Sequence, residues 1–199
     1  MKNQKIVWIT KVAILSAMAS VLMLLEFPLP FVAPGFYELD FSEVPVLIGA
    51  FALGPWAGVC IEAIKILLNF IMNGSITGGV GEFSNFLLGV VFVLPAAIIY
   101  HRNKTKKSAV IGLITAGLTM VILGCFINAY VMLPLYSTLM PLDAIIAQAA
   151  AIWPAIDSVF EFVLLCVAPF NIIKAILVSL LTMILYKRLS PLLKGKKTE

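Results

Sequence analysis

Twelve of the fourteen Lys and Arg residues in this chain of 199 fall into three short tracts, at residues 2–11, 102–107 and 187–197. The sequence between these basic tracts is almost continuously apolar. Loops rich in Lys and Arg stay on the cytoplasmic side of membrane proteins, so the tracts assign three points of the chain to one face. This distribution indicates a polytopic membrane protein with both the N- and C-termini in the cytoplasm.

Composition supports a membrane fold. Apolar residues make up 62% of the chain and charged residues 12%, whereas soluble domains carry about 25% charged residues. The length gives room for about six spans of about 20 residues each and for no separate soluble domain. We therefore expect residues 1–199 to form a single membrane-embedded, all-α domain. The three cysteines are isolated in apolar stretches, without the spacing of metal ligands, so no metal site is expected.

The number of crossings must agree with the basic tracts. Long apolar stretches predict helices at residues 8–27, 56–72, 80–100 and 109–133. Because the first two tracts lie on the same side, an even number of crossings must separate them, and the missing one is residues 43–53. At 1.5 Å per residue this segment spans only about 17 Å of the roughly 30 Å hydrocarbon core. We expect a short helix, ended by Gly54-Pro55, that other helices cover or that faces a cavity.

The same argument places one more crossing before the third basic tract. Residues 169–188 are long enough, and proline is favoured in the first turn of a helix. The apolar stretch 144–168 is then expected to form an outer helical cap, interrupted at Pro154. The result is a fold of six transmembrane helices, with residues 28–42 and 134–168 on the outer side.

This topology brings polar side chains together in the outer half of the bundle. Glu82 with Asn85, and Asn171 with Lys174, are three residues apart and therefore share one helical face. Asn128 lies near the outer end of its helix. The first outer loop adds the acidic residues Glu38, Asp40 and Glu43.

Two cations lie inside apolar runs, where each costs several kcal/mol and therefore requires a function or a partner. Lys174 also opposes the helix macrodipole, because it lies near a helix N-terminus. It either contacts a ligand or forms a structural ion pair with an acidic residue: Glu82, Asp157 or Glu161. Lys65 differs, since Glu62 stands three residues before it and favours a structural pair on the same helix.

Catalytic motifs are missing from the sequence. The single histidine, His101, lies in a basic tract and is expected to be solvated. There is no H-E-x-x-H, no G-x-S-x-G and no G-x-x-x-x-G-K-[ST] phosphate loop, so the chain is not expected to be an enzyme, and any work driven by ATP requires another chain. Two alternatives to a small-molecule transporter component stay open, namely a small membrane enzyme of lipid metabolism and a structural assembly subunit.

Two segments carry a specific resemblance. Residues 40–45, Asp-Phe-Ser-Glu-Val-Pro, and residues 169–174, Pro-Phe-Asn-Ile-Ile-Lys, resemble the riboflavin-specific substrate-binding components of energy-coupling factor (ECF) vitamin transporters. The resemblance extends over almost the whole chain. It implies a six-helix protein of the bacterial cytoplasmic membrane, whose first outer loop forms a lid over a pocket on the extracellular side. It also implies dependence on a membrane coupling subunit and two cytoplasmic ATPase subunits. A component for a different vitamin is a further alternative.

The resemblance also implies roles for individual residues. Riboflavin, bound as a substrate and with no cofactor, needs a flat apolar slot and hydrogen-bonding groups around it. The ligand-binding residues that the resemblance implies are Asn171, Lys174, Glu82, Asn85, Asn128, Leu39, Asp40, Tyr37 and Tyr130. The first helix carries Ala13 and Ala17, an Ala-x-x-x-Ala pattern that in the family faces the coupling subunit. Small residues at this spacing allow helices to approach closely. The alternative is that these alanines pack within the chain.

Overall fold

The computed structural model describes residues 2–75 and 77–194, so Ile76 and the last cations of the third basic tract, Lys196 and Lys197, lie outside the described residues. The described chain is mostly helical. Five of its helical segments are long and apolar enough to cross a membrane: Gln4–Met23, Pro55–Asn73, Val80–Asn103, Lys106–Tyr136 and Val159–Tyr186.

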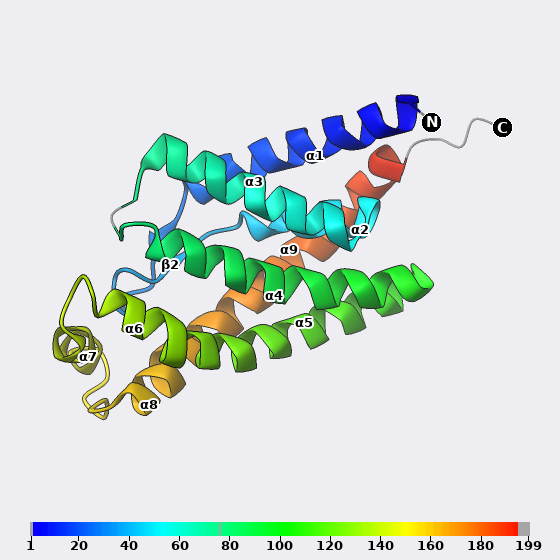
Figure 1. The fold of residues 1–199 in the computed structure, drawn as a ribbon. Coiled ribbons are helices and arrows are strands. Elements are labelled where there is room, and N and C mark those ends of the chain that lie inside the picture. Colours follow the sequence, from blue (N-terminus) through cyan, green and yellow to red (C-terminus); the bar gives the residue numbers. More distant parts are fainter. Residues whose placement is uncertain (1, 76, 195–199) are drawn as a thin grey trace.

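These segments form an elongated bundle (Figure 1). The start of α1 (Lys2–Met23), the end of α9 (Ala168–Lys194) and the turn from α4 (Val80–Asn103) to α5 (Lys106–Ile127) lie at one end. The opposite end carries α7 (Leu142–Ala150) and the loop after α1. The three regions that hold the basic tracts are thus gathered at the same end of the molecule.

The short helix expected at residues 43–53 is present as α2 (Glu43–Leu53). Nine of its eleven residues are buried, and it packs against α1, α3 (Pro55–Asn73), α4 and α9. Gly54 ends α2 with a φ of +117°, where a side chain would be strained, and Pro55 begins α3 at once. The covering of α2 by other helices, which its short length requires, is therefore confirmed.

His101 helps to hold this short helix. Its ring is half-buried rather than solvated, and Nε2 lies 2.9 Å from the carbonyl oxygen of Ala50 in the last turn of α2. The same carbonyl oxygen also accepts a hydrogen bond of 3.0 Å from the backbone N–H of Gly54, so the ring adds a contact from α4 to the end of α2. The expectation of a solvated histidine was wrong because sequence position alone does not reveal this contact.

The loop after α1 contains a two-residue hairpin ladder. Strands β1 (Phe27–Pro28) and β2 (Glu38–Leu39) are antiparallel, with Phe27 opposite Leu39 and Pro28 opposite Glu38. The ladder ties the two ends of the loop together, so residues 29–37 close over the end of the bundle. An apolar cluster that includes Val32, Ala33 and Leu39 anchors this loop to the outer parts of α7 and the last helical span.

Two π-helical turns interrupt the long spans. One, η1 (Asn128–Met132), separates α5 from α6 (Leu133–Tyr136), and the other, η2 (Val163–Val167), separates α8 (Val159–Phe162) from α9. Such turns often occur at functional sites, because they redirect the side chains around them. Here the first begins at Asn128, and the second ends four residues before Asn171.

The sequence prediction was wrong for residues 159–168. They were expected in an outer cap, but they form the beginning of the last helical span, which runs continuously from Val159 to Tyr186. Pro169 lies inside this span rather than near its start. The π turn directly before it accounts for the difference, because the wider turn accommodates a residue that has no backbone N–H. Only α7 remains as a separate cap helix, and the chain breaks around Pro154 as expected.

Candidate functional site

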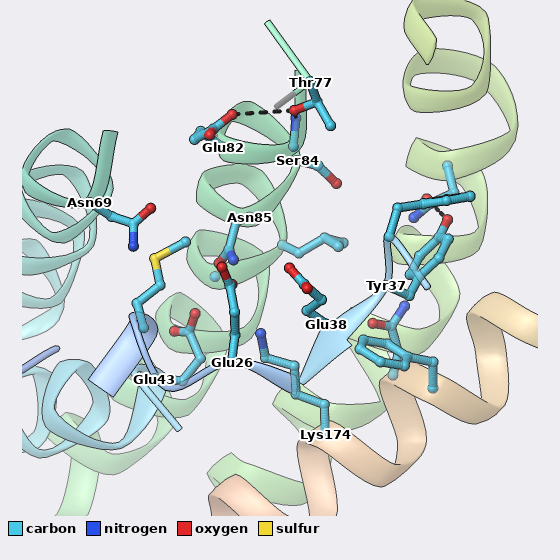
Figure 2. A pocket seen from close by; sticks show the side chains of 18 of the residues that line it. Glu26, Tyr37, Glu38, Glu43, Asn69, Thr77, Glu82, Ser84, Asn85 and Lys174 are labelled. Carbon is cyan, nitrogen blue, oxygen red and sulfur yellow. Dashed lines mark hydrogen bonds between the residues drawn. The ribbon is translucent and has the colours of Figure 1, made fainter. Parts of the chain in front are cut away.

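A cavity of about 170 Å³ lies beneath the loop after α1, at the end of the bundle opposite the α4–α5 turn. Its walls come from this loop, from α3, α4 and α9, and from the π turn η1. Figure 2 shows side chains from these elements pointing into a common space. Six of the nine residues expected to bind a ligand line the cavity: Asn171, Lys174, Glu82, Asn85, Asn128 and Tyr37.

The amide of Asn171 is the clearest sign of a missing partner. Its side chain is only 2% exposed, yet within the described part of the chain its Nδ2 has no hydrogen-bond acceptor. A buried polar group without a partner costs about 1–3 kcal/mol. A Cβ added at Gly124 on α5 would lie 2.8 Å from this nitrogen, so the glycine leaves room for the amide. The arrangement is suited to a ligand that supplies an acceptor.

Asn128 and Tyr37 connect the loop to the helices. The hydroxyl of Tyr37 donates a hydrogen bond of 2.6 Å to Oδ1 of Asn128. The amide nitrogen of Asn128 donates to the carbonyl oxygen of Gly124, at 2.9 Å. The Tyr37 ring packs edge-on against Phe170, with 5.5 Å between ring centroids. Tyr37 therefore closes one side of the cavity.

Lys174 is both a cavity residue and half of an ion pair. Its Nζ lies 2.9 Å from Oδ2 of Asp40, and both residues are buried. Burial alone would raise the pKa of Asp40, but the positive charges of Lys174 and Lys65 and hydrogen bonds to its carboxylate lower that pKa to about 2. The partner is not Glu82, Asp157 or Glu161, which the sequence suggested. The pair fixes the ammonium group at the cavity wall (Figure 2).

Carboxylates occupy the outer part of the cavity. Glu82 accepts a hydrogen bond of 2.8 Å from the hydroxyl of Ser75. Glu26 follows α1 and lines the same cavity. Burial, together with the negative charges of Glu38 and Asp40, raises the pKa of Glu26 to about 7.

A second ionic group lies below the cavity, within the bundle. Nζ of Lys65 is 2.7 Å from Glu62 and 2.8 Å from Glu43, and all three residues are fully or almost fully buried. The expected structural pair of Lys65 with Glu62 is confirmed. Glu43, at the start of α2, is an additional partner, which joins α2 to α3.

Three of the expected ligand residues do not line the cavity. Leu39 is buried in the apolar cluster beneath the loop, and Asp40 acts behind Lys174 instead of facing the space. Tyr130 is 75% exposed and stacks on Phe126, away from the cavity. It comes two positions after the inward-facing Asn128 and therefore lies on roughly the opposite face of the helix. The two alanines of α1, Ala13 and Ala17, are exposed on the side of the bundle.

Sequence reasoning missed other cavity residues. Glu26, Glu43 and Asn69 line the cavity but were not among the expected ligand residues. Asn69 is 3% exposed, and its Nδ2 has no acceptor among the described residues. A polar residue inside a membrane span is by itself a sign of a functional site, so Asn69 in α3 could have been identified in this way.

The fold and the cavity together define a class of protein. A helical bundle with apolar spans surrounds a small cavity, in which polar groups converge between aromatic side chains. Such sites bind small molecules. Residues 8–186 match the family described as ECF transporter, substrate-specific component. The chain belongs to this family, whose members are transporter components and not enzymes.

Characterised relatives agree with this assignment. The chain is 38% identical to the riboflavin transporter RibU of Staphylococcus aureus over 183 residues, which cover 92% of this chain and 90% of the relative. It is 33% identical to the riboflavin transporter FmnP of Bacillus subtilis over 199 residues, which cover 100% of this chain and 98% of the relative. A solved structure of the S component of a bacterial ECF transporter superposes with a TM-score of 0.75 at 36% identity, covering 98% of this chain and all of that one.

Proposed function

We propose that this protein binds riboflavin in the cavity beside Asn171 and Lys174 and takes it up as the substrate-specific component of an ATP-driven ECF transporter. The observation that carries the proposal is the buried amide nitrogen of Asn171, which has no acceptor among the described residues, in a cavity that Lys174 also lines. The identities of 33% and 38% to riboflavin transporters support the choice of ligand.

The chemistry of the cavity fits a flavin. Phe36, Tyr37 and Phe170 offer apolar faces to a flat ring system. The Asn171 amide both donates and accepts, as the carbonyls and ring nitrogens of a flavin require, and the ammonium of Lys174 donates. Glu82, Asn85 and Asn128 can pair with the hydroxyls of the ribityl chain.

Entry of riboflavin requires movement of the loop after α1. The cavity of about 170 Å³ is smaller than the roughly 300–1,000 Å³ of typical ligand sites. Phe36, Tyr37 and Glu38 of this loop form part of its wall. The loop is therefore proposed as a lid on the extracellular side, which opens to admit the ligand and closes over it.

A direct test uses protein purified in detergent and freed of ligand, with affinity measured by quenching of flavin fluorescence. Riboflavin should bind tightly, and Asn171→Leu should weaken binding about 5- to 150-fold, since lost hydrogen bonds of this kind are worth about 1–3 kcal/mol. Tyr130→Phe, outside the cavity, should bind as the wild type does. Failure to bind riboflavin, with tight binding of another vitamin, would reassign the component to that vitamin.

We further propose that residues 1–199 form one domain with six transmembrane helices in the bacterial cytoplasmic membrane, α2 being the short crossing. Both termini and the α4–α5 turn would be cytoplasmic, because the basic tracts lie there. A membrane coupling subunit and two cytoplasmic ATPases would supply the energy, with Ala13 and Ala17 contacting the coupling subunit.

Cysteine labelling tests this orientation in whole cells, in a chain whose three native cysteines have been replaced. Gly35→Cys should react with an impermeant thiol reagent, since Gly35 is exposed in the proposed lid and an added Cβ meets no atom within 4 Å. Asn103→Cys, exposed at the end of α4, should react only after the cells are permeabilised. Equal labelling of both in intact cells would reject the orientation.

A further inference from the structure

An apolar groove of about 450 Å³ runs along the outside of the bundle between α5 and α9, and among the described residues only these two helices line it. Small residues, Gly117, Ala175 and Ser179, lie where the helices approach each other. A Cβ added at Gly117 would lie 3.4 Å from the Cβ of Ala175. Larger side chains form the edges, such as Leu118 and Ile176, which are 61% and 54% exposed. The described chain therefore leaves a furrow open between two packed helices.

The length of the groove matches one leaflet of a membrane. On α5 it extends from Val110 to Val121, and on the antiparallel α9 from Met183 back to Ile172. At 1.5 Å per residue, either stretch is about 17 Å long, close to half of the roughly 30 Å hydrocarbon core. Val110 and Met183 lie toward the α4–α5 turn and the end of α9 (Figure 1). In the orientation proposed above, the groove thus occupies the cytoplasmic half of the membrane.

Cations stand at the cytoplasmic mouth of the groove. Lys106 is exposed in the first turn of α5, one turn before Val110 and on the same face of the helix. Among the described residues, no Asp or Glu oxygen lies within 4.0 Å of its Nζ. Lys107 is exposed beside it, and the third basic tract begins at Lys187, one turn beyond Met183 on α9. Both helices therefore place basic residues at the end of the groove where lipid headgroups lie.

We propose that this groove binds an anionic phospholipid of the cytoplasmic leaflet, with one acyl chain between α5 and α9 and the phosphate at Lys106. The lining, which is apolar apart from Ser179, suits the chain, and the match in length places the headgroup level with the cation. A phosphate there also meets the N-terminus of α5, where the helix dipole favours negative charge. Each juxtamembrane Lys or Arg changes the affinity for an anionic lipid about fivefold. The proposal uses the orientation proposed above but not the identity of the ligand in the cavity.

The test titrates delipidated protein in detergent with phosphatidylglycerol or with phosphatidylcholine of identical acyl chains, and counts bound lipid by native mass spectrometry. The wild type should bind one phosphatidylglycerol at least about fivefold more tightly than phosphatidylcholine. Lys106→Gln should weaken binding of phosphatidylglycerol about fivefold and leave phosphatidylcholine unchanged. Ser179→Phe, which places a ring in the groove, should weaken both lipids alike. Because Lys106→Gln alters only an exposed side chain, the test does not depend on the folding of Ser179→Phe.

Two matched controls lie outside the groove. Lys5→Gln removes an exposed cation of α1 at the same end of the bundle, and Ala63→Phe adds the same ring at an exposed alanine of α3. Both should bind the two lipids as the wild type does. A loss in Lys5→Gln as large as in Lys106→Gln would overturn the proposal, because the attraction would then be spread over the whole basic end.

Three other outcomes also contradict the lipid site. Equal affinity of the wild type for the two lipids would show that the cations have no role. Binding that a folded Ser179→Phe variant leaves unchanged would place the lipid elsewhere. Dimers that phosphatidylglycerol does not dissociate, and that Ser179→Phe does, would make a second copy of the chain the occupant. Binding in detergent is independent of orientation and of riboflavin, so these failures are distinct from failure of the cysteine labelling or of flavin binding.

Discussion

Lys174→Met should lower the free energy of unfolding of the ligand-free protein by about 3–5 kcal/mol, the usual cost of removing one partner from a buried ion pair. The structure gives the reason. Asp40 is fully buried, and besides Lys174 its carboxylate accepts a hydrogen bond from the backbone N–H of Ser42. Methionine keeps most of the apolar stem of the lysine side chain, so the loss of stability comes from the unpaired charge of Asp40.

Melting curves in detergent test this expectation. Asp40→Asn added to Lys174→Met should recover much of the lost stability, because the amide oxygen still accepts from Ser42 and no charge remains. Lys107→Met, at an exposed position in the α4–α5 region, serves as the matched control and should melt as the wild type does. A Lys174→Met protein with unchanged stability would show that the Asp40 pair does not support the fold.

The same substitution also tests the role of Lys174 in binding. One N–H of its ammonium is directed at Asp40, and the residue lines the cavity, so the remaining donors are available to a flavin carbonyl. Loss of a charge-assisted hydrogen bond of about 1.5–3 kcal/mol weakens riboflavin affinity roughly 10- to 150-fold. Affinity is measured on the folded fraction. Normal affinity in a destabilised variant would leave Lys174 a purely structural role.

Most of the helical architecture could be predicted from the sequence, because apolar length and loop charge are local properties. The expected span at 80–100 begins at Val80 as observed, and α2 has the expected limits of Glu43 and Leu53. The prediction failed where a proline was taken as a helix start. Pro169 lies inside the last span because a π turn precedes it, and π turns have no clear sequence pattern.

The candidate site was predicted less completely, for a similar reason. Polar residues inside apolar spans, such as Asn171 and Lys174, are recognisable because their burial in a membrane is costly. The partner of Lys174 was not recognisable, since Asp40 lies 134 residues away in a loop whose path depends on tertiary packing. The exposure of Tyr130 was recognisable, since a residue two positions after Asn128 lies on roughly the opposite face of a helix.

A second large effect is expected on riboflavin uptake when bulky residues are placed on α1. Ala13→Trp with Ala17→Trp should abolish riboflavin uptake in cells that also contain the coupling subunit and the ATPases, while the purified variant still binds riboflavin. Both alanines are exposed on α1 and neither lines the cavity. Close approach of two membrane helices requires small residues at their contact, so a pair of indole rings prevents it.

Comparison of uptake and binding separates this role from internal packing. If the alanines contact the coupling subunit, the variant loses uptake but keeps its riboflavin affinity and melting temperature. Ala63→Trp, which places the same bulky ring at an exposed alanine of α3, is the matched control and should retain uptake. A parallel loss of binding and stability in the Ala13 and Ala17 variant would instead mean that these residues pack within the bundle. Because the exposed face of α1 leaves both side chains accessible to another helix, we expect the first result.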